Sequence, residues 1–169
     1  MTAPPQHIRA AAPADWAQLW PIIDEVVAAR ETFTCDPGMS QAEARAMWIE
    51  SAPGLTVVAV DAIEGGRVLG TAKMGPNRQG PGAHVSTASF MVAADARGRG
   101  VGTALCAYAL DWARAAGFAG MQFNAVAASN TAAVAVYERL GFEIVGTVPR
   151  AFEHPRLGRV GLHVMYCEF

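Results

Sequence analysis

The sequence predicts an α/β fold in which helices cover both faces of one mixed β-sheet. Two observations carry this prediction. Segments rich in β-branched residues and segments whose apolar residues recur every three or four positions follow one another in a mixed order. No charge run, serine-rich stretch or internal repeat divides the 169 residues, a length that suits one core of ordinary size. We therefore expect a single domain over residues 1–169.

The N-terminal part predicts one strand and two helices. Residues 7–12 are strand-like, and Pro13 and Asp15 then introduce an amphipathic helix. Ser40 and Glu43 have the S-x-x-E spacing of a capping box, so a second helix begins there. The apolar stripe of the first helix contains Trp16, Leu19, Trp20, Ile23 and Val27.

A hairpin and a loop follow. Residues 55–75 contain two β-branched runs joined by Gly65 and Gly66, which is the pattern of an antiparallel hairpin. Residues 75–83 are too rich in glycine and proline for regular structure, and we expect a loop there.

The second half predicts a βαβ unit and a closing helix with two strands. A strand at 83–92, a helix at 102–117 and a strand at 119–127 make the βαβ unit. The helix has Leu105, Ala109, Trp112 and Ala116 on one stripe, with Gly117 at its C-terminus. The remaining expected elements are a helix at 129–141 and strands at 142–148 and 161–169.

Charge and hydropathy narrow the function classes. The formal net charge is −2 and 17% of residues are charged, so the basic excess of a nonspecific nucleic-acid binder is missing. The first ten residues have no apolar leader, and no run of eighteen apolar residues follows. We expect a cytoplasmic protein with neither a nucleic-acid nor a membrane partner.

The cysteines and histidines predict neither disulfides nor a metal site. Cys35, Cys106 and Cys167 are widely spaced without a C-x-x-C pair, which indicates reduced core thiols. The histidines lack the spacing of metal ligands, so we assign no metal. The apolar ending "LHVMYCEF" is expected to be an edge strand that can pair in a homodimer.

The stretch "ADARGRGVGTAL" has glycines at 98, 100 and 102 where a helix begins. Each glycine costs about 1 kcal/mol relative to alanine inside a helix, so propensity does not explain them. A strand, a glycine-rich turn and a helix N-terminus together form an anion site, because unpaired N–H groups and the positive end of the helix dipole converge there. Arg97 and Arg99 add cations, and the loop suits a diphosphate.

Spacing separates the known phosphate loops. The Walker A pattern is absent because no lysine follows, and Lys73 is the only lysine of the chain. The glycines give G-x-G-x-G rather than the dinucleotide pattern G-x-G-x-x-G. What remains is R-x-x-G-x-G at Arg97, Gly100 and Gly102, with a tight turn that binds no ligand as the alternative.

Two motifs resemble one enzyme family. "FMVAADARGRGVGTAL" resembles the coenzyme A pyrophosphate loop of the GCN5-related N-acetyltransferases, the GNAT family. "ASNTAAVAVYERLGFEIVGTV" is similar to the second signature of that family, in which Asn opens a helix, Tyr follows seven residues later and Gly-Phe starts a strand. The two matches lie within residues 89–148.

The resemblance implies a single GNAT domain that uses acetyl-CoA as acetyl donor. The implied fold is a mixed, mostly antiparallel sheet of about seven strands, splayed between strands 4 and 5, with about four helices on both faces. The loop amides would hold the pyrophosphate, and the strand before the loop would pair with the pantetheine arm. The implied cofactor-binding residues are Met91, Val92, Arg97, Gly98, Arg99, Gly100, Val101, Gly102, Thr103 and Asn130.

The resemblance also implies direct attack of an amine on the thioester, with an exposed backbone N–H donating to the oxyanion. Tyr137, nearly two helical turns after Asn130, is the candidate acid for the departing thiolate, and a core tyrosine is the alternative. His84 is the first candidate base by its reference pKa, while Glu153 and Glu31 could act through water. Each has a plain surface role as its alternative.

The acceptor is expected to be small and amino-acid-like. "ETFTCDP" and "HVSTASFMV" look similar to parts of acetyltransferases that modify phosphinothricin, and "FNAVAASN" with "GTVPRAF" is similar to enzymes that act on azetidine-2-carboxylate and proline analogues. Asn124 and Arg78 are candidates to bind an acceptor carboxylate, and Glu31 is a third substrate candidate. The alternatives are an interior asparagine bonded to the backbone for Asn124 and a solvated loop arginine for Arg78.

Three alternative functions stay open. A protein N-terminus or a lysine could be the acceptor, although no long acidic run is present to collect basic peptides. A noncatalytic acyl-CoA sensor is possible, but the complete loop and Tyr137 argue against it. A generic phosphate-binding or nucleotide module is the third alternative.

Overall fold

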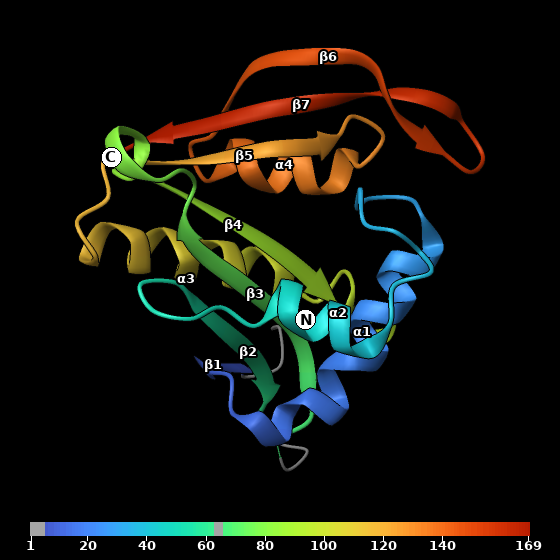
Figure 1. Ribbon diagram of the computed structural model, residues 1–169, viewed down its shortest axis with the longest axis vertical. Coiled ribbons are helices and arrows are strands. Elements are labelled where there is room, and N and C mark those ends of the chain that lie inside the picture. Colours follow the sequence, from blue (N-terminus) through green and yellow to red (C-terminus); the bar gives the residue numbers. More distant parts are fainter. Residues whose placement is uncertain (1–5, 63–65) are drawn as a thin grey trace.

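A computed structural model describes residues 6–62 and 66–169, which form a seven-stranded sheet with four α-helices (Figure 1). The strands are β1 Gln6–Ala10, β2 Leu55–Asp61, β3 Val68–Pro76, β4 Val85–Val92, β5 Gly120–Ala127, β6 Glu143–His154 and β7 Gly158–Glu168. The helices are α1 Trp16–Ala29, α2 Gln41–Trp48, α3 Val101–Ala115 and α4 Thr131–Arg139.

The strand order is β1-β2-β3-β4-β5-β7-β6, and every neighbouring pair is antiparallel except β4 and β5, which are parallel. The parallel pair is joined by α3, so the predicted βαβ unit is confirmed. The predicted fold class, a mixed and mostly antiparallel sheet between helices, is confirmed as well.

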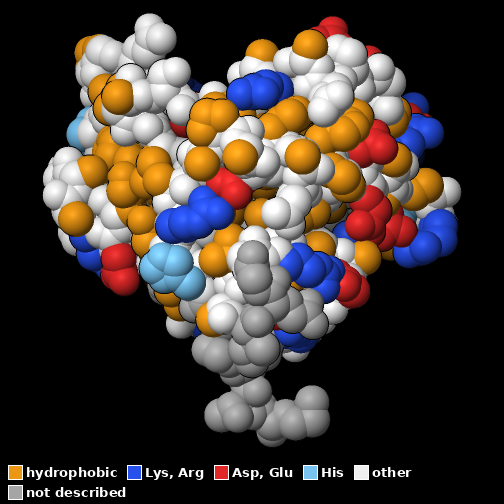
Figure 2. All heavy atoms as spheres, turned by 90° about the horizontal axis from the view of Figure 1, so that it is seen from below, with side chains coloured by type: hydrophobic (Ala, Val, Ile, Leu, Met, Phe, Trp, Pro, Cys, Tyr) orange, Lys and Arg blue, Asp and Glu red, His pale blue; other side chains and the backbone are white. Residues whose placement is uncertain are grey.

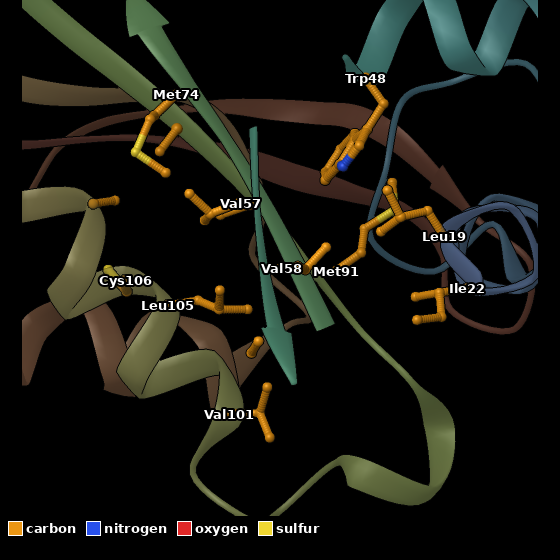
Figure 3. Close-up of a cluster of buried hydrophobic side chains, with 14 of the residues drawn as sticks. Leu19, Ile22, Trp48, Val57, Val58, Met74, Met91, Val101, Leu105 and Cys106 are labelled. Carbon is orange, nitrogen blue, oxygen red and sulfur yellow. The ribbon is translucent and has the colours of Figure 1, made fainter. Parts of the chain in front are cut away.

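Helices pack on both faces of β2, β3 and β4. Figure 3 shows Leu19 of α1 and Trp48 of α2 on one side of these strands, near Met91, with Leu105 and Cys106 of α3 on the other side. Trp48 is fully buried, and its indole N–H donates to Thr71 Oγ1 at 3.0 Å, so even this large polar ring has its partner inside the core.

Asp15 does more than mark the start of α1. Its carboxylate accepts two hydrogen bonds from the Arg9 guanidinium, at 2.7 and 2.8 Å, and one from Ala12 N at 2.7 Å. The hydrogen bonds from Arg9 lower the pKa of this buried carboxyl group below its ordinary value, against the opposing effect of burial. The N-terminus of α1 is thereby tied to β1.

Several boundaries differ from prediction. β6 continues to His154 rather than ending at 148, and β7 starts at Gly158 rather than 161, because the two strands pair along most of a long hairpin. Ala116, assigned to the apolar stripe of α3, is exposed at the helix end. Of the two hairpin glycines, Gly65 lies outside the described residues.

The prediction that residues 162–169 form a free edge is wrong. β7 lies between β5 and β6 and pairs with both, so its backbone groups are used on each side. The edge at this end of the sheet is β6, whose residues from Glu143 to Ala151 are all exposed, including Val145 and Val148.

The cysteines are free thiols in different environments. Cys106 and Cys167 are buried, as predicted, whereas Cys35 is only half-buried, with its sulfur 3.5 Å from Met47 Sδ. Burial, with a smaller contribution from Cys167, raises the pKa of the Cys106 thiol to about 12, so that thiol stays protonated at neutral pH.

The distribution of charged side chains on the surface is consistent with the low net charge. On the face that Figure 2 shows, basic and acidic side chains are interspersed among apolar ones, without a continuous basic area. Within the described ranges, no helix is long and apolar enough to cross a membrane.

Candidate active site

The parallel strands β4 and β5 separate shortly after they meet. Only two residue pairs join them, Val85 with Gly120 and Ser86 with Met121. Beyond Ser86, β4 pairs only with β3, and beyond Met121, β5 pairs only with β7. The sheet is therefore splayed between its fourth and fifth strands, as the sequence resemblance implies.

A cleft of about 960 Å³ passes through this splay. At one end it is lined by the segment after α1 and by Asn124 of β5; we call this the acceptor end. At the other end it is lined by the loop at 97–103 and by α4; we call this the donor end. Residues 87–92 of β4 line the cleft between the two ends, including the predicted Met91 and Val92. The lining thus includes residues of α1 on one side of the sheet and of α3 on the other (Figure 3).

The donor-end loop depends on glycine. Gly98 and Gly100 have φ angles of +74° and +80°, a left-handed conformation that side chains adopt with strain. A Cβ atom at either position would meet no atom within 4 Å, so no packing requirement excludes one. Both residues line the cleft. The backbone conformation and the open space beside it leave room for a ligand to approach the main chain closely.

The loop leaves a set of backbone N–H groups for a ligand. The N–H groups of Arg97 and Arg99 donate to the carbonyls of Ala94 and Ala96, at 3.4 Å each. The first backbone bond of α3 runs from Ala104 N to Gly100 O, so the N–H groups of residues 101–103 have no partner within the helix. These N–H groups stand at the positive end of a fifteen-residue helix. The site suits a phosphate or diphosphate.

The two loop arginines differ. Arg97 lines the cleft, with its Nη2 3.1 Å from Glu25 Oε1 of α1. Arg99 is not among the lining residues, and its Nη2 lies 3.8 Å from Asp61 Oδ2 at the end of β2. The guanidinium of Arg99 is therefore placed to anchor the loop to the sheet rather than to reach into the cleft.

Tyr137 lines the cleft from α4. Its ring contacts Phe123, Phe142 and Phe90, with centroids 4.6, 5.9 and 6.1 Å away. Burial raises the pKa of the Tyr137 hydroxyl well above its ordinary value, and Cys106 adds to the effect. The hydroxyl therefore stays protonated at neutral pH and is available as a proton donor.

Asn130 fixes the start of α4. Its side-chain oxygen caps the helix by accepting from Ala133 N at 3.3 Å, and the residue lines the cleft. Because the carboxamide oxygen is used by the cap, its N–H₂ group can donate to a ligand.

Comparison with known proteins now decides the family. A model of the Acetyltransferase (GNAT) family matches residues 20–142. The chain belongs to the GNAT family.

A GCN5-related N-acetyltransferase from Kribbella flavida shares 52% identity with this GNAT, with a TM-score of 0.94 over 97% of this chain and 98% of that one. A phosphinothricin acetyltransferase from Sinorhizobium meliloti, solved with acetyl-CoA, shares 25% identity over 97% and 88%, with a TM-score of 0.85. A ribosomal-protein-alanine N-acetyltransferase from Brucella melitensis shares 28% over 96% and 99%, with a TM-score of 0.81.

Among curated proteins, Protein SPT10 of Saccharomyces cerevisiae is 32% identical over 83 residues. This match covers 49% of the GNAT chain and only 13% of the yeast protein. The family, the fold and the cleft together make this GNAT an acetyltransferase that takes its acetyl group from acetyl-CoA.

Two of the three predicted base candidates lie away from the GNAT cleft. His84 is exposed just before β4, with Nδ1 3.0 Å from Pro81 O, at the end of β4 where the strands are still joined. Glu153 is exposed on β6, opposite Arg159. Neither lines the cleft, so the geometry gives neither a path to an acceptor amine. Glu31 does line it.

Asn124 also lines the cleft, and Arg78 does not. Asn124 and Asn77 exchange hydrogen bonds through their carboxamides, at 2.7 and 3.3 Å, and Gln122 Nε2 donates to Asn124 Oδ1 at 2.9 Å. Arg78 donates from Nη1 to the backbone oxygen of Asn77 at 2.9 Å. Asn77 thus links the two predicted residues, and Asn124 keeps one N–H for a ligand.

Sequence reasoning missed Asn77, Gln122 and Arg156. Arg156, in the turn between β6 and β7, forms an ion pair with Glu31. Asn77 and Gln122 could have been found from their places near strand ends, but nothing in the sequence signals that Arg156 meets a residue after α1. Within the described residues, no group of three or more potential ligands is placed to hold a metal ion.

Proposed function

We propose that this GNAT transfers the acetyl group to the amine of a small, amino-acid-like acceptor. The observation that carries the proposal is the acceptor end of the cleft, where a carboxylate, Glu31, and an amide donor, Asn124, line the same space. An amino acid has a cationic amine and an anionic carboxylate, which are complementary to such a pair. The similarity to a phosphinothricin acetyltransferase supports the same acceptor class.

The donor end has a separate task. The N–H groups of Gly98, Gly100 and the first turn of α3, with Arg97, bind the diphosphate of acetyl-CoA. The unpaired edge of β4 holds the pantetheine arm, with Asn130 as a further donor. Bound in this way, acetyl-CoA supplies a thioester whose carbonyl faces the acceptor amine.

Protons move at two places. Glu31 accepts a proton from the acceptor amine, directly or through water, because it is the cleft-lining carboxylate at the acceptor end. The amine then attacks the carbonyl carbon of the thioester. As negative charge develops on the carbonyl oxygen, a backbone N–H group exposed between β4 and β5 donates a hydrogen bond to it. The hydroxyl of Tyr137 protonates the departing sulfur. As the intermediate collapses, the attacking nitrogen loses its second proton to water. Glu31 then releases its own proton to solvent, and Tyr137 regains one from solvent, so one proton is released in each turnover.

The decisive experiment is an acceptor screen with acetyl-CoA, read as thiol release. Its panel contains the twenty standard L-amino acids, phosphinothricin, polyamines and peptides with free N-termini. We expect turnover with free amino acids, and poorer turnover with the corresponding amides, since a polar group of the site would lose its partner. Equal or better turnover of peptides would favour a protein N-terminus as acceptor, in line with the Brucella melitensis relative. Tight acetyl-CoA binding without any thiol release would point to the sensor alternative.

Cytoplasmic action is part of the proposal. It is supported by three free thiols and by the low net charge, which fit a reducing compartment and a small-molecule partner.

A further inference from the structure

An ion pair lies at the border of the cleft, because Glu31 lines the cleft and its partner Arg156 lies just outside the lining. Glu31 follows α1, and Arg156 lies in the turn between β6 and β7, two segments far apart in the sequence. Arg156 Nη2 is 2.7 Å from Glu31 Oε1. Figure 1 places the segment after α1 and the tip of the β6–β7 hairpin on the same side of the molecule. The pair therefore ties the turn between β6 and β7 to a residue that lines the cleft.

The charges at this end are few. Among the described residues that line the cleft, Glu31 is the only carboxylate. The other charged lining residues are Arg97, which belongs to the donor-end loop, and Arg139, on α4. An acceptor ammonium group therefore finds its opposite charge at Glu31, whose present partner is Arg156.

We propose that the Glu31–Arg156 pair opens to receive a free α-amino acid as a zwitterion, with the ammonium group on Glu31 and the carboxylate on Arg156. The proposal rests on the proposed function and names the recognition mode of its acceptor, with the charged Arg156 in place of the uncharged Asn124 as the main partner of the carboxylate. Arg156 is 75% exposed and Glu31 37%, and an exposed ion pair is worth little, so its separation is easy. Both side chains regain a partner of opposite charge in the complex.

The same arrangement discriminates against other amines. A simple amine or a peptide N-terminus also needs Glu31 and separates it from Arg156, but brings no α-carboxylate to replace it. Only the free amino acid compensates both charges. Arg156 is thus a specificity-determining residue that comes from outside the family motifs.

Acetylation removes the positive charge that attracts the acceptor to Glu31. The reaction converts the ammonium group into a neutral amide, so the product keeps its carboxylate and loses its positive charge. The product has nothing to offer the Glu31 carboxylate, which competes with it for Arg156. Re-formation of the Glu31–Arg156 pair therefore favours product release.

The test measures kcat/KM for three acceptors in wild-type enzyme and in variants. The acceptors are the best amino acid of the screen above, its primary amide and its decarboxylated amine, each at saturating acetyl-CoA. In Arg156→Gln we expect kcat/KM for the amino acid to fall about tenfold or more, mainly through KM, while the amide changes little. The acid-to-amide preference should therefore collapse, and Arg156→Lys should restore part of it. The KM for acetyl-CoA and the melting temperature should stay unchanged.

Two matched arginines serve as controls. Arg159→Gln removes another exposed charge of the β6–β7 hairpin, and Arg78→Gln removes the guanidinium beside Asn77. Neither should alter the acid-to-amide preference. An unchanged preference in Arg156→Gln, or a collapse in Arg78→Gln instead, would overturn the zwitterion site while leaving an amino-acid acceptor in place. Equal turnover of acid and amide by the wild-type enzyme, or no turnover of any amino acid, would overturn the proposed function as well.

Discussion

The two ends of the cleft are built in different ways. The donor end is made by consecutive residues, the loop from Arg97 to Thr103, and it offers backbone N–H groups. The acceptor end brings together side chains from the segment after α1, from β5, from the loop after β3 and from the β6–β7 turn. Backbone donors bind any ligand with a diphosphate, whereas side chains on separate segments can change one by one. The donor end is thus suited to a constant substrate and the acceptor end to a variable one.

The largest effect is expected when the proposed proton donor, Tyr137 of α4, is removed from the donor end of the cleft. In Tyr137→Phe we expect kcat to fall roughly 10²- to 10⁴-fold, the usual range for a positioned general acid. KM for acetyl-CoA should change little, because the ring and its contacts with Phe123 and Phe142 remain. Steady-state kinetics from pH 6 to 9 is the measurement.

Tyr108→Phe is the matched control for this experiment, because Tyr108 is half-buried on α3 and does not line the cleft. It should keep wild-type activity. A Tyr137→Phe enzyme that retains most of its kcat would transfer the role of acid to water.

A second test concerns the loop backbone. Gly100→Val places a branched side chain in the open space beside the loop, so acetyl-CoA affinity should fall by roughly an order of magnitude or more. Calorimetric titration measures it. Gly117→Val is an apt control, since Gly117 has φ +83° and open space as well, but lies beyond the other end of α3. Equal affinity of the two variants would remove the loop from the donor site.

The third test compares the two arginines of the donor-end loop, Arg97 and Arg99. Arg97→Gln should weaken acetyl-CoA binding about two- to fivefold, as expected for an exposed charge, and the loss should vanish with acetyl-pantetheine, which lacks the diphosphate. Arg99→Gln should have a smaller effect, because that side chain faces Asp61. A larger loss in Arg99→Gln would show that this guanidinium turns into the cleft when ligand binds.

The smallest effect on catalysis is expected from Asp15, which ties the start of α1 to β1 far from the acceptor end. Asp15→Asn should lower stability by about 1–3 kcal/mol at pH 7, since charge-assisted hydrogen bonds from Arg9 are lost. The pKa of Asp15 is depressed in the folded state, so its contribution is present above the ordinary value and is lost as pH falls through the folded one. In thermal melts, the difference in melting temperature between wild type and variant should be larger at pH 7 than at pH 2, and kcat should be unchanged.

The difference between the two ends also explains what the sequence could predict. The loop, the cap Asn130 and Tyr137 are local in the chain, so their spacing predicts the start of one helix and one face of another. The structure places them along one cleft, with Arg99 as the exception in the loop. The splay followed from the family resemblance. Glu31 and Asn124 were selected as candidates and do line the cleft.

The contacts at the acceptor end could not be predicted from the sequence, because they join segments that are far apart in the chain. His84 lies away from the cleft because β4 and β5 are still paired at the start of β4. The type of a residue does not reveal the point at which two strands separate. The partner of Glu31 depends on the length of the β6–β7 hairpin, which extends past the predicted strand ends. The edge position of β6 likewise depends on strand order, and the apolar composition of β7 reflects burial between two neighbours.

The two-pair junction of β4 and β5 has a thermodynamic consequence. Most of the facing edges of these strands lack the cross-strand bonds that hold the rest of the sheet, so the unliganded fold is incomplete there. In the proposed binding mode, the pantetheine arm of acetyl-CoA would lie between β4 and β5 like an additional strand, and its binding free energy would add to the free energy of unfolding. At a ligand concentration about 100 times Kd this coupling amounts to about 2.7 kcal/mol, a large part of the stability of an ordinary domain. Amide hydrogens along β4 should then exchange with solvent more slowly as the concentration of acetyl-CoA rises.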